Sequence, residues 1–418
     1  MSILDLLTLL IFLAAVFTLL NITILKLPST IGLMAIALMM SVVILLLGLI
    51  FPAVTIGASH IVEEFDFQEV LLNVMLNFLL FAGALSMDLR KLLEERVPVL
   101  ILATVGTLIS TFVVGFLIML VFPRLGVNID PIYCFLFGAL ISPTDPIAVL
   151  ALVKKFNLSK NLEIQIAGES LFNDGVGVVI FLTILGIARK GMDSFDLTEV
   201  ALLFGTEVIG GLLMGAIFGF LGFKLLDYID NDHVELEVLV TLTLVMVGGR
   251  IAELLHVSAP LAMVVMGLFI GNEGRDEKMA NATGEYVFKF WHLLDEALNA
   301  ILFILIGLEM IVIAKDFSID MLLIGLTGVL IVLVARFIGV ILPIGTMSMF
   351  RKFEKKTVAI LTWGGLRGGI SVALALSLAD FAQITNEVKV IILFTTYCAV
   401  VISILVQGLT IPLLLKNK

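Results

Sequence analysis

Long apolar runs separated by short polar segments dominate this chain of 418 residues. A helix needs about 20 apolar residues to cross a hydrocarbon core of roughly 30 Å, so windows of that length locate candidate spans. They fall at residues 4–25, 27–49, 69–89, 97–121, 131–153, 162–188, 198–226, 234–255, 259–271, 286–313, 320–346, 357–379 and 388–414. The pattern predicts an all-α polytopic membrane protein with about thirteen transmembrane helices, forming one membrane unit over residues 1–418.

Composition supports the same class of protein. Hydrophobic residues make up 61% of the chain and charged residues 14%, and the mean hydropathy is +1.19. Ordinary soluble domains contain far more charge. The sequence contains no nucleotide, haem or nucleic-acid motif, so no cofactor and no nucleic-acid partner are expected, and the lipid bilayer is the predicted environment.

The basic residues predict how the chain is oriented, because basic loops stay on the cytoplasmic side of a membrane. If the N-terminus lies outside and the C-terminus in the cytoplasm, most lysines and arginines fall in cytoplasmic segments. The external segments then hold only Arg124, Arg189, Lys190, Lys315 and Lys389. Short loops and the brief C-terminal segment favour the inner membrane of a prokaryote.

The fifth span contains the motif "SPTDP", in which Pro143 and Pro146 flank Thr144 and Asp145. Each proline lacks an N–H and frees a carbonyl one turn earlier. Such carbonyls are tolerated at membrane depth only where they face protein or a wet cavity. A carboxylate beside free carbonyls has the chemistry of a cation site, although a simple proline kink with a solvated Asp145 would explain the same residues.

The twelfth span contains "WGGLRGG", which surrounds Arg367 with four glycines. Each glycine destabilises a helix by about 1 kcal/mol relative to alanine, so an unwound segment is expected. Close helix packing is the alternative, but it does not explain a central arginine.

Spans five and twelve run in opposite directions and lie seven spans apart. The same offset pairs spans one to six, residues 1–190, with spans eight to thirteen, residues 234–418, and leaves residues 198–226 as a connector. The sequence therefore predicts an inverted-topology repeat with two crossing broken helices, the architecture of many secondary transporters. This expectation rests on topology, since the two halves share no clear sequence identity.

The sixth span contains "GESLFNDG", residues 168–175, within an otherwise apolar run. An ionisable residue in a span costs about 2.5 to 3.5 kcal/mol on insertion scales and is a functional candidate by default. Ser170 and Asp174 lie four residues apart on one helix face, and Glu169 and Asn173 lie on a second. One face can therefore offer oxygens to a cation while the other is bonded internally.

A buried Glu169 requires a positive partner, because an unpaired buried carboxylate is costly. Arg336, isolated in the apolar span eleven, and Arg367 are both candidates, and the sequence leaves the choice open. Gly175 and Gly177 would let another helix approach closely, as a site shared with span five requires.

Several motifs in order resemble those of the monovalent cation:proton antiporter family, in the branch of bacterial NhaP and animal NHE exchangers. They are "LKLPSTIG", "SPTDP", "GESLFNDG", "VARFIGV" around Arg336, "WGGLRGG" and "VQGLT" at residues 406–410. The resemblance covers nearly the whole chain. It implies the NhaA-like antiporter fold, a homodimer, a mobile core of spans four to six and eleven to thirteen, and a dimerisation domain of spans one to three and eight to ten.

The resemblance also implies a site for sodium. Asp174 would be the main carboxylate that binds either a cation or a proton. Asp145, the Thr144 carbonyl and Ser170 would complete the Na⁺ site.

Four further residues would have supporting roles. Glu169 would act through water or by pairing with Arg336, Asn173 would hold Glu169 in place, and Arg367 would belong to the glycine-rich break. An asparagine directly before Asp174 goes with electroneutral exchange in this family.

The predicted function is exchange of Na⁺ or Li⁺ for H⁺, without enzymatic activity. Burial disfavours a charged carboxylate and a bound cation favours it, so sodium and protons would compete for Asp174. Exchange of K⁺ or of a broad range of monovalent cations for H⁺ is the main alternative. A cation channel and an intramembrane aspartyl protease are remote alternatives, and the expected protease motifs are absent from the sequence.

Overall fold

The computed structural model describes residues 3–63, 70–147, 149–150, 159–191, 196–229, 233–273, 282–314, 318–379 and 381–415. Helices dominate these ranges, and no strand is found within them. Two residues far apart in the sequence, Asp145 and Leu366, form an isolated backbone bridge. The predicted all-α class is therefore confirmed for the described part of the chain.

The first half of the chain folds into a series of helices and short helical segments. The elements are α1 (Ile3–Leu20), η1 (Asn21–Leu25), α2 (Ser29–Gly48), α3 (Pro52–Glu63), η2 (Val70–Met75), α5 (Leu76–Ser86), α6 (Leu89–Glu94), α7 (Arg96–Ile101), η3 (Leu102–Gly106), α8 (Thr107–Val121), η4 (Phe122–Leu125), α9 (Pro131–Ile141) and α11 (Lys160–Lys190).

The second half contains the longest helices. Its elements are α12 (Leu197–Tyr228), α13 (Val234–Leu254), α14 (Ala259–Glu273), α15 (Ala282–Ile313), α16 (Ile319–Met347), α17 (Thr357–Trp363), α18 (Gly369–Leu376), α19 (Asn386–Ile402), η7 (Ser403–Gln407) and α20 (Gly408–Leu415).

The helix lengths confirm a polytopic membrane protein. Within the described residues, eight helical stretches are long and apolar enough to cross a membrane, and shorter apolar helices accompany them. The count of thirteen spans stays a prediction. Helix α3 was not predicted, because its 12 residues are fewer than a spanning window requires. The end of predicted span five, residues 151–153, lies outside the described residues.

Both predicted helix interruptions are present. Helix α9 ends at Ile141, before the first proline of "SPTDP". Helix α17 ends at Trp363, and α18 begins at Gly369. The two interruptions meet where the Asp145 N–H donates to the Leu366 carbonyl over 2.8 Å. The prolines and glycines therefore predicted the positions of the breaks correctly, and the two interrupted segments are in contact.

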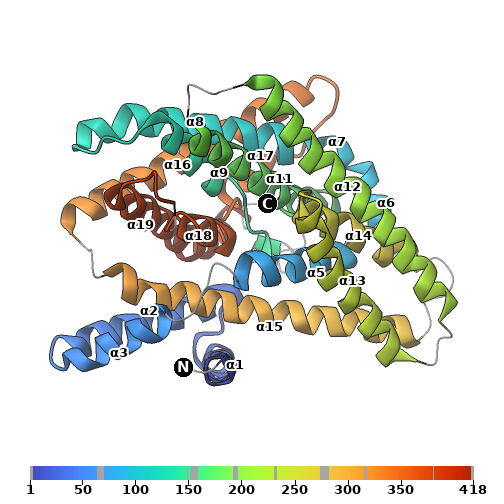
Figure 1. Cartoon of the computed structure of the whole chain (residues 1–418), viewed down its shortest axis with the longest axis horizontal. Helices are drawn as coiled ribbons and strands as arrows, with labels where there is room; N and C mark the ends of the chain where they lie inside the picture. The colour runs from blue at the N-terminus through green and yellow to red at the C-terminus, as the bar shows by residue number, and fades with distance from the viewer. Residues whose placement is uncertain are drawn as a thin grey trace.

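Figure 1 shows how the helices are arranged. Helix α8 packs against α9 and α16, and α16 packs against α19. Helix α14 packs against α5 and α12, and α15 runs beside α2 along the lower side of the view. Helix α11 contacts both α9 and α14. The helix that carries "GESLFNDG" therefore lies between the two groups.

Candidate functional site

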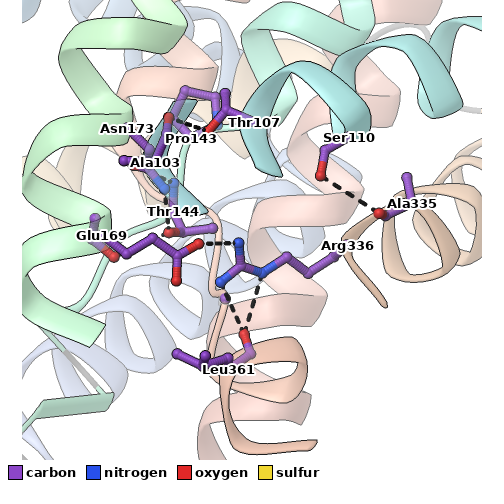
Figure 2. A network of polar contacts seen from close by, with 12 residues as sticks. Ala103, Thr107, Ser110, Pro143, Thr144, Glu169, Asn173, Ala335, Arg336 and Leu361 are labelled. Atoms are coloured by element: carbon purple, nitrogen blue, oxygen red, sulfur yellow. Dashed lines mark hydrogen bonds and ion pairs between the residues drawn. The ribbon is translucent and has the colours of Figure 1, made fainter. Parts of the chain in front are cut away.

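The interrupted segment after α9 is held by α11. The Thr144 N–H donates to Asn173 Oδ1 at 3.2 Å, and Asn173 Nδ2 donates to Thr144 Oγ1 at 2.8 Å. The hydroxyls of Thr144 and Ser170 lie 3.0 Å apart and share a hydrogen bond. All three side chains are buried, and Figure 2 shows Asn173 beside Thr144. These bonds fix the backbone of the break against α11.

The contacts of Asn173 correct one expectation. Asn173 was predicted to hold Glu169, but both ends of its amide bond to Thr144. The cause is the helix break. Because α9 ends at Ile141, the Thr144 N–H has no helical acceptor, and a buried N–H requires another partner.

Asp145 is fixed where the two helix interruptions meet. Besides its backbone bond to Leu366, its Oδ1 accepts a hydrogen bond from the Ile147 N–H at 2.9 Å. Gly368 packs directly on it, since a Cβ atom at position 368 would lie 2.8 Å from the Asp145 Cβ. The absence of a side chain on Gly368 therefore permits the approach of span twelve to this carboxylate.

Asp174 and Asp145 line the same cavity, whose volume is about 1200 Å³. Asp174 is 9% exposed, and Asp145 is partly exposed. Thr144 also lines the cavity, whereas the structure does not place Ser170 on its wall. Asp145, Asp174 and Thr144 thus face a shared space, and Ser170 lies behind Thr144, to which it is hydrogen-bonded.

The same cavity extends to Lys91 and Lys160. Both lysines lie in segments that the basic-residue pattern predicts to be cytoplasmic. Asp88, at the N-terminus of α6, lines this part of the cavity as well. The aspartates are therefore connected by open space with the predicted cytoplasmic side.

A buried ion pair also involves α11. Arg336 Nη1 bonds to Glu169 Oε1, and both side chains are buried. The remaining donors of Arg336, Nε and Nη2, donate to the Leu361 carbonyl at 3.2 and 2.9 Å, as Figure 2 shows. The partner that the sequence left open is Arg336, and the pair connects α11 and α16 with α17.

Arg367 occupies the second break and contacts carbonyls. Its Nη1 donates to the Pro143 carbonyl at 3.3 Å and to the Gly365 carbonyl at 3.4 Å. Its backbone N–H donates to Ser403 Oγ at 3.0 Å. The side chain is buried. Arg367 thus places positive charge beside one carbonyl from each of the two interrupted segments, Pro143 in span five and Gly365 in span twelve.

The two glycines of span six, Gly175 and Gly177, contact different segments. A Cβ at Gly177 would lie 2.3 Å from Pro143 Cγ, so this glycine permits the predicted approach of span five. A Cβ at Gly175 would lie 2.6 Å from Leu261 Cδ2, so Gly175 accommodates α14 instead. The predicted contact with span five is confirmed for Gly177 alone.

The motif "VQGLT" has a structural explanation that the sequence did not supply. Gln407 Nε2 donates to the Trp363 carbonyl at 3.2 Å, and Trp363 Nε1 donates to Thr410 Oγ1 at 2.9 Å. The motif therefore holds the end of α17, directly before the glycine-rich break.

Sequence reasoning did not assign Asp295 and Asn299 of α15 to the site, although both line the cavity. The available signal was a pair of polar residues four apart in an apolar span, which places them on one helix face.

Known proteins resemble the chain over nearly its whole length. A family model described as sodium/hydrogen exchanger, transmembrane, matches residues 9–417. The Na⁺/H⁺ antiporter NhaP of Pseudomonas aeruginosa is 46% identical, over 99% of this chain and 96% of that protein. The Na⁺/H⁺ antiporter NhaH of Halobacillus dabanensis is 32% identical, over 90% of this chain and 91% of that protein.

A solved structure extends the similarity to the fold. The sodium proton antiporter MjNhaP1 from Methanocaldococcus jannaschii, at pH 8, superimposes with a TM-score of 0.76 and 21% sequence identity. The match covers 98% of this chain and 97% of that one. The resemblance expected from the motifs is confirmed, and the chain belongs to the sodium/hydrogen exchanger family.

Proposed function

We propose that this protein exchanges Na⁺ or Li⁺ for H⁺ across a membrane, with cation and proton competing for Asp174. The observation that carries the proposal is that Asp145 and Asp174 line one cavity, beside the point where the two helix interruptions meet. Membership of the exchanger family and the names of the antiporters described above support the same function.

The proposed Na⁺ site consists of Asp145, Asp174, the Thr144 carbonyl and Ser170. Carboxylate, carbonyl and hydroxyl oxygens suit a hard cation. The Ser170–Thr144–Asn173 hydrogen bonds support this assignment, because they hold the break next to the helix that carries Asp174. A ligand set held in this way needs little reorganisation when the ion binds.

Coupling of cation movement to proton movement follows from the free-energy cost of moving a charge through a low-dielectric region. Asp174 neutralised by a proton or by Na⁺ can cross between the two sides, whereas an empty, ionised site would carry unpaired charge. One cation would replace one proton, and the neighbouring Asn173 adds no second titrating group. The exchange is therefore expected to be electroneutral.

Alternating access would come from movement of spans four to six and eleven to thirteen against spans one to three and eight to ten. The Glu169–Arg336 pair supports a rigid core, because it joins α11 to α16 and, through Leu361, to α17. We further propose a homodimer in a prokaryotic inner membrane, with the N-terminus outside. In this orientation, the cavity faces the cytoplasm.

The function is tested with purified protein in liposomes that carry an imposed pH gradient and an internal pH dye. Na⁺, Li⁺ and K⁺ are added in turn, with and without a clamp on the membrane potential. Collapse of the gradient by Na⁺ or Li⁺ alone, unaffected by the clamp, is the expected result. Collapse by K⁺ as well would indicate a broader cation/proton exchanger, and absence of cation-dependent proton flux would overturn the proposal.

Substitution of the main carboxylate provides the sharpest variant. Asp174→Asn cannot carry the charge that pairs with Na⁺ or the proton that is exchanged, so transport should fall by at least about 100-fold. Asp130→Asn is the control, since this aspartate is exposed at the start of α9 and should leave the rate unchanged. Normal exchange by Asp174→Asn protein would contradict the proposed competition.

A further inference from the structure

The inner half of α15 presents a polar face to the cavity. Asp295 and Asn299 both line it. Asn299 Nδ2 donates to the Asp295 carbonyl at 2.9 Å and to Asp295 Oδ1 at 3.0 Å. These two bonds fix the orientation of the Asn299 amide. Its Oδ1 is buried and has no hydrogen-bond partner among the described residues, and Asn299 as a whole is 5% exposed.

A second buried oxygen on the cavity wall comes from α18. Ser371 is 1% exposed and lines the same cavity. Its hydroxyl likewise finds no partner in the part of the chain that the structure describes. Buried polar atoms in proteins are nearly always hydrogen-bonded, so unpartnered oxygens on a cavity wall require an explanation. Thr30 Oγ1, on α2, is a third oxygen of this kind on the same wall among the described residues.

Helix packing brings these two elements together. A Cβ at Gly369, the first residue of α18, would lie 2.3 Å from Leu302 Cδ1 on α15. Leu302 follows Asn299 by three residues and therefore shares its helix face. Ser371 lies in the first turn of α18 as well, on a different face of that helix from Gly369. The start of α18 thus packs on the same stripe of α15 that carries Asn299.

This polar face lies next to the proposed Na⁺ site without being part of it. Gly368, directly before α18, packs on Asp145. Asp295 and Asp145 line the same cavity. Gly368 therefore contacts Asp145, and the next residue, Gly369, contacts Leu302 on α15.

The charge of the cavity wall favours a cation there. Carboxylates line it at Asp88, Asp145, Glu163, Asp174, Asp295 and Glu296. Its lysines are Lys91 and Lys160. A wall with this excess of acidic groups concentrates cations in the space that it encloses.

The donor atoms define the class of ligand. A carboxylate, an amide oxygen and a hydroxyl are hard oxygen ligands, and this set contains no soft ligand that would select a transition metal. With its NH₂ group already engaged, the Asn299 amide can offer only its oxygen. One negative charge and two neutral oxygens suit a monovalent cation that keeps part of its water shell.

We infer that Asp295, Asn299 Oδ1 and Ser371 Oγ form a second, weaker site for a monovalent cation beside the exchange site. This inference rests on the proposed function, because it supplies Asp145 and Asp174 with a cation already stripped of part of its water. A cation held here raises the local concentration at the exchange site without taking part in proton coupling. Asp295 and Asn299 belong to α15 of the proposed dimerisation domain, so they would stay in place while Asp174 moves.

Direct binding tests the second site independently of transport. Purified protein with Asp145→Asn and Asp174→Asn, which disable the exchange site, is titrated with radioactive Na⁺ at equilibrium. Residual binding of about one ion per chain is expected, and adding Asp295→Asn should weaken it by roughly tenfold or more. Ser371→Ala, which removes a hydroxyl that has no partner among the described residues, should weaken it as well.

Glu296→Gln is the matched control. It removes the same charge from the neighbouring position, where the side chain is 68% exposed. Its effect on residual binding should stay below about twofold if ligation, rather than general charge, holds the ion. Equal losses from Asp295→Asn and Glu296→Gln, or no residual binding at all, would overturn the second site.

Transport kinetics separate failure of this inference from failure of the proposed function. Asp295→Asn in the otherwise unchanged protein should raise the Na⁺ concentration for half-maximal exchange by about fivefold and leave the maximal rate within about twofold. Exchange by the unchanged protein with no shift in Asp295→Asn would contradict the second site alone. No exchange by the unchanged protein would contradict the proposed function itself.

Discussion

At the scale of single residues, most buried polar side chains near the two helix interruptions are bonded within the protein, whereas Asp174 is not. Thr144, Asn173, Glu169 and Arg336 bond to one another or to backbone carbonyls. Asp174 has no such partner within the described part of the chain and faces the cavity. The bonded side chains hold the break and the helices in place, and the Asp174 carboxylate is available to a ligand.

The buried ion pair yields a prediction about stability. Arg336→Ala would leave Glu169 charged and unpaired in a dry environment, which costs about 3 to 5 kcal/mol. Thermal unfolding in detergent should show a clear loss of stability. The double variant Glu169→Gln/Arg336→Ala should recover much of that loss, because no unpaired charge remains. Equal stability of the single and double variants would contradict the assignment of this pair.

At the scale of elements, the sequence indicated where helices break but not how the breaks are held together. Prolines and glycines act on their own segment, so the interruptions in spans five and twelve could be read locally. The backbone bond from Asp145 to Leu366 and the contact of Gly177 with Pro143 join residues from different spans. Local patterns suggested such an approach but could not pair individual residues.

The approach of α11 to the break gives a prediction at this scale. Gly177→Ala places a methyl group 2.3 Å from Pro143 Cγ, so the break must move away from Asp174. Overpacking of this kind costs about 1 to 3 kcal/mol, and exchange in liposomes should fall by about tenfold or more, at 1.36 kcal/mol per factor of ten.

Gly186→Ala is the control on the same helix, because nothing lies within 4 Å of an added Cβ there. This variant should transport normally and be slightly more stable, since alanine favours a helix by about 1 kcal/mol over glycine. Similar losses in the two variants would mean that helix flexibility, rather than the contact with Pro143, matters for transport.

At the scale of the whole molecule, the cavity connects the aspartates with one end of the helix assembly. Its wall includes Lys91 and Lys160 at that end and α15 along one side. If the basic residues mark the cytoplasm, the structure has the form expected of an inward-facing transporter. The orientation of the chain can be tested through the accessibility of this wall.

Thiol labelling supplies that test in a protein whose two cysteines, Cys134 and Cys398, are replaced by alanine. Ala297→Cys, on the exposed part of the cavity wall, should react with a membrane-impermeant reagent in inside-out vesicles only. Ile319→Cys, 82% exposed at the start of α16, should react in right-side-out vesicles only. The reverse pattern would show that the predicted orientation is wrong.

The sequence by itself determined the membrane class, the all-α fold and both interruptions, and it singled out Asp145 and Asp174 as ionisable residues within apolar segments. Each of these follows from hydrophobicity, proline and glycine chemistry or buried charge, which act within one segment, and family motifs assigned the roles. Only the tertiary structure decided that Glu169 pairs with Arg336, 167 positions away, and that Asn173 bonds to Thr144. It also added Asp295, Asn299 and Ser371 to the cavity wall. Contacts between distant segments depend on how the helices pack, because packing selects one partner among several that the sequence allows equally.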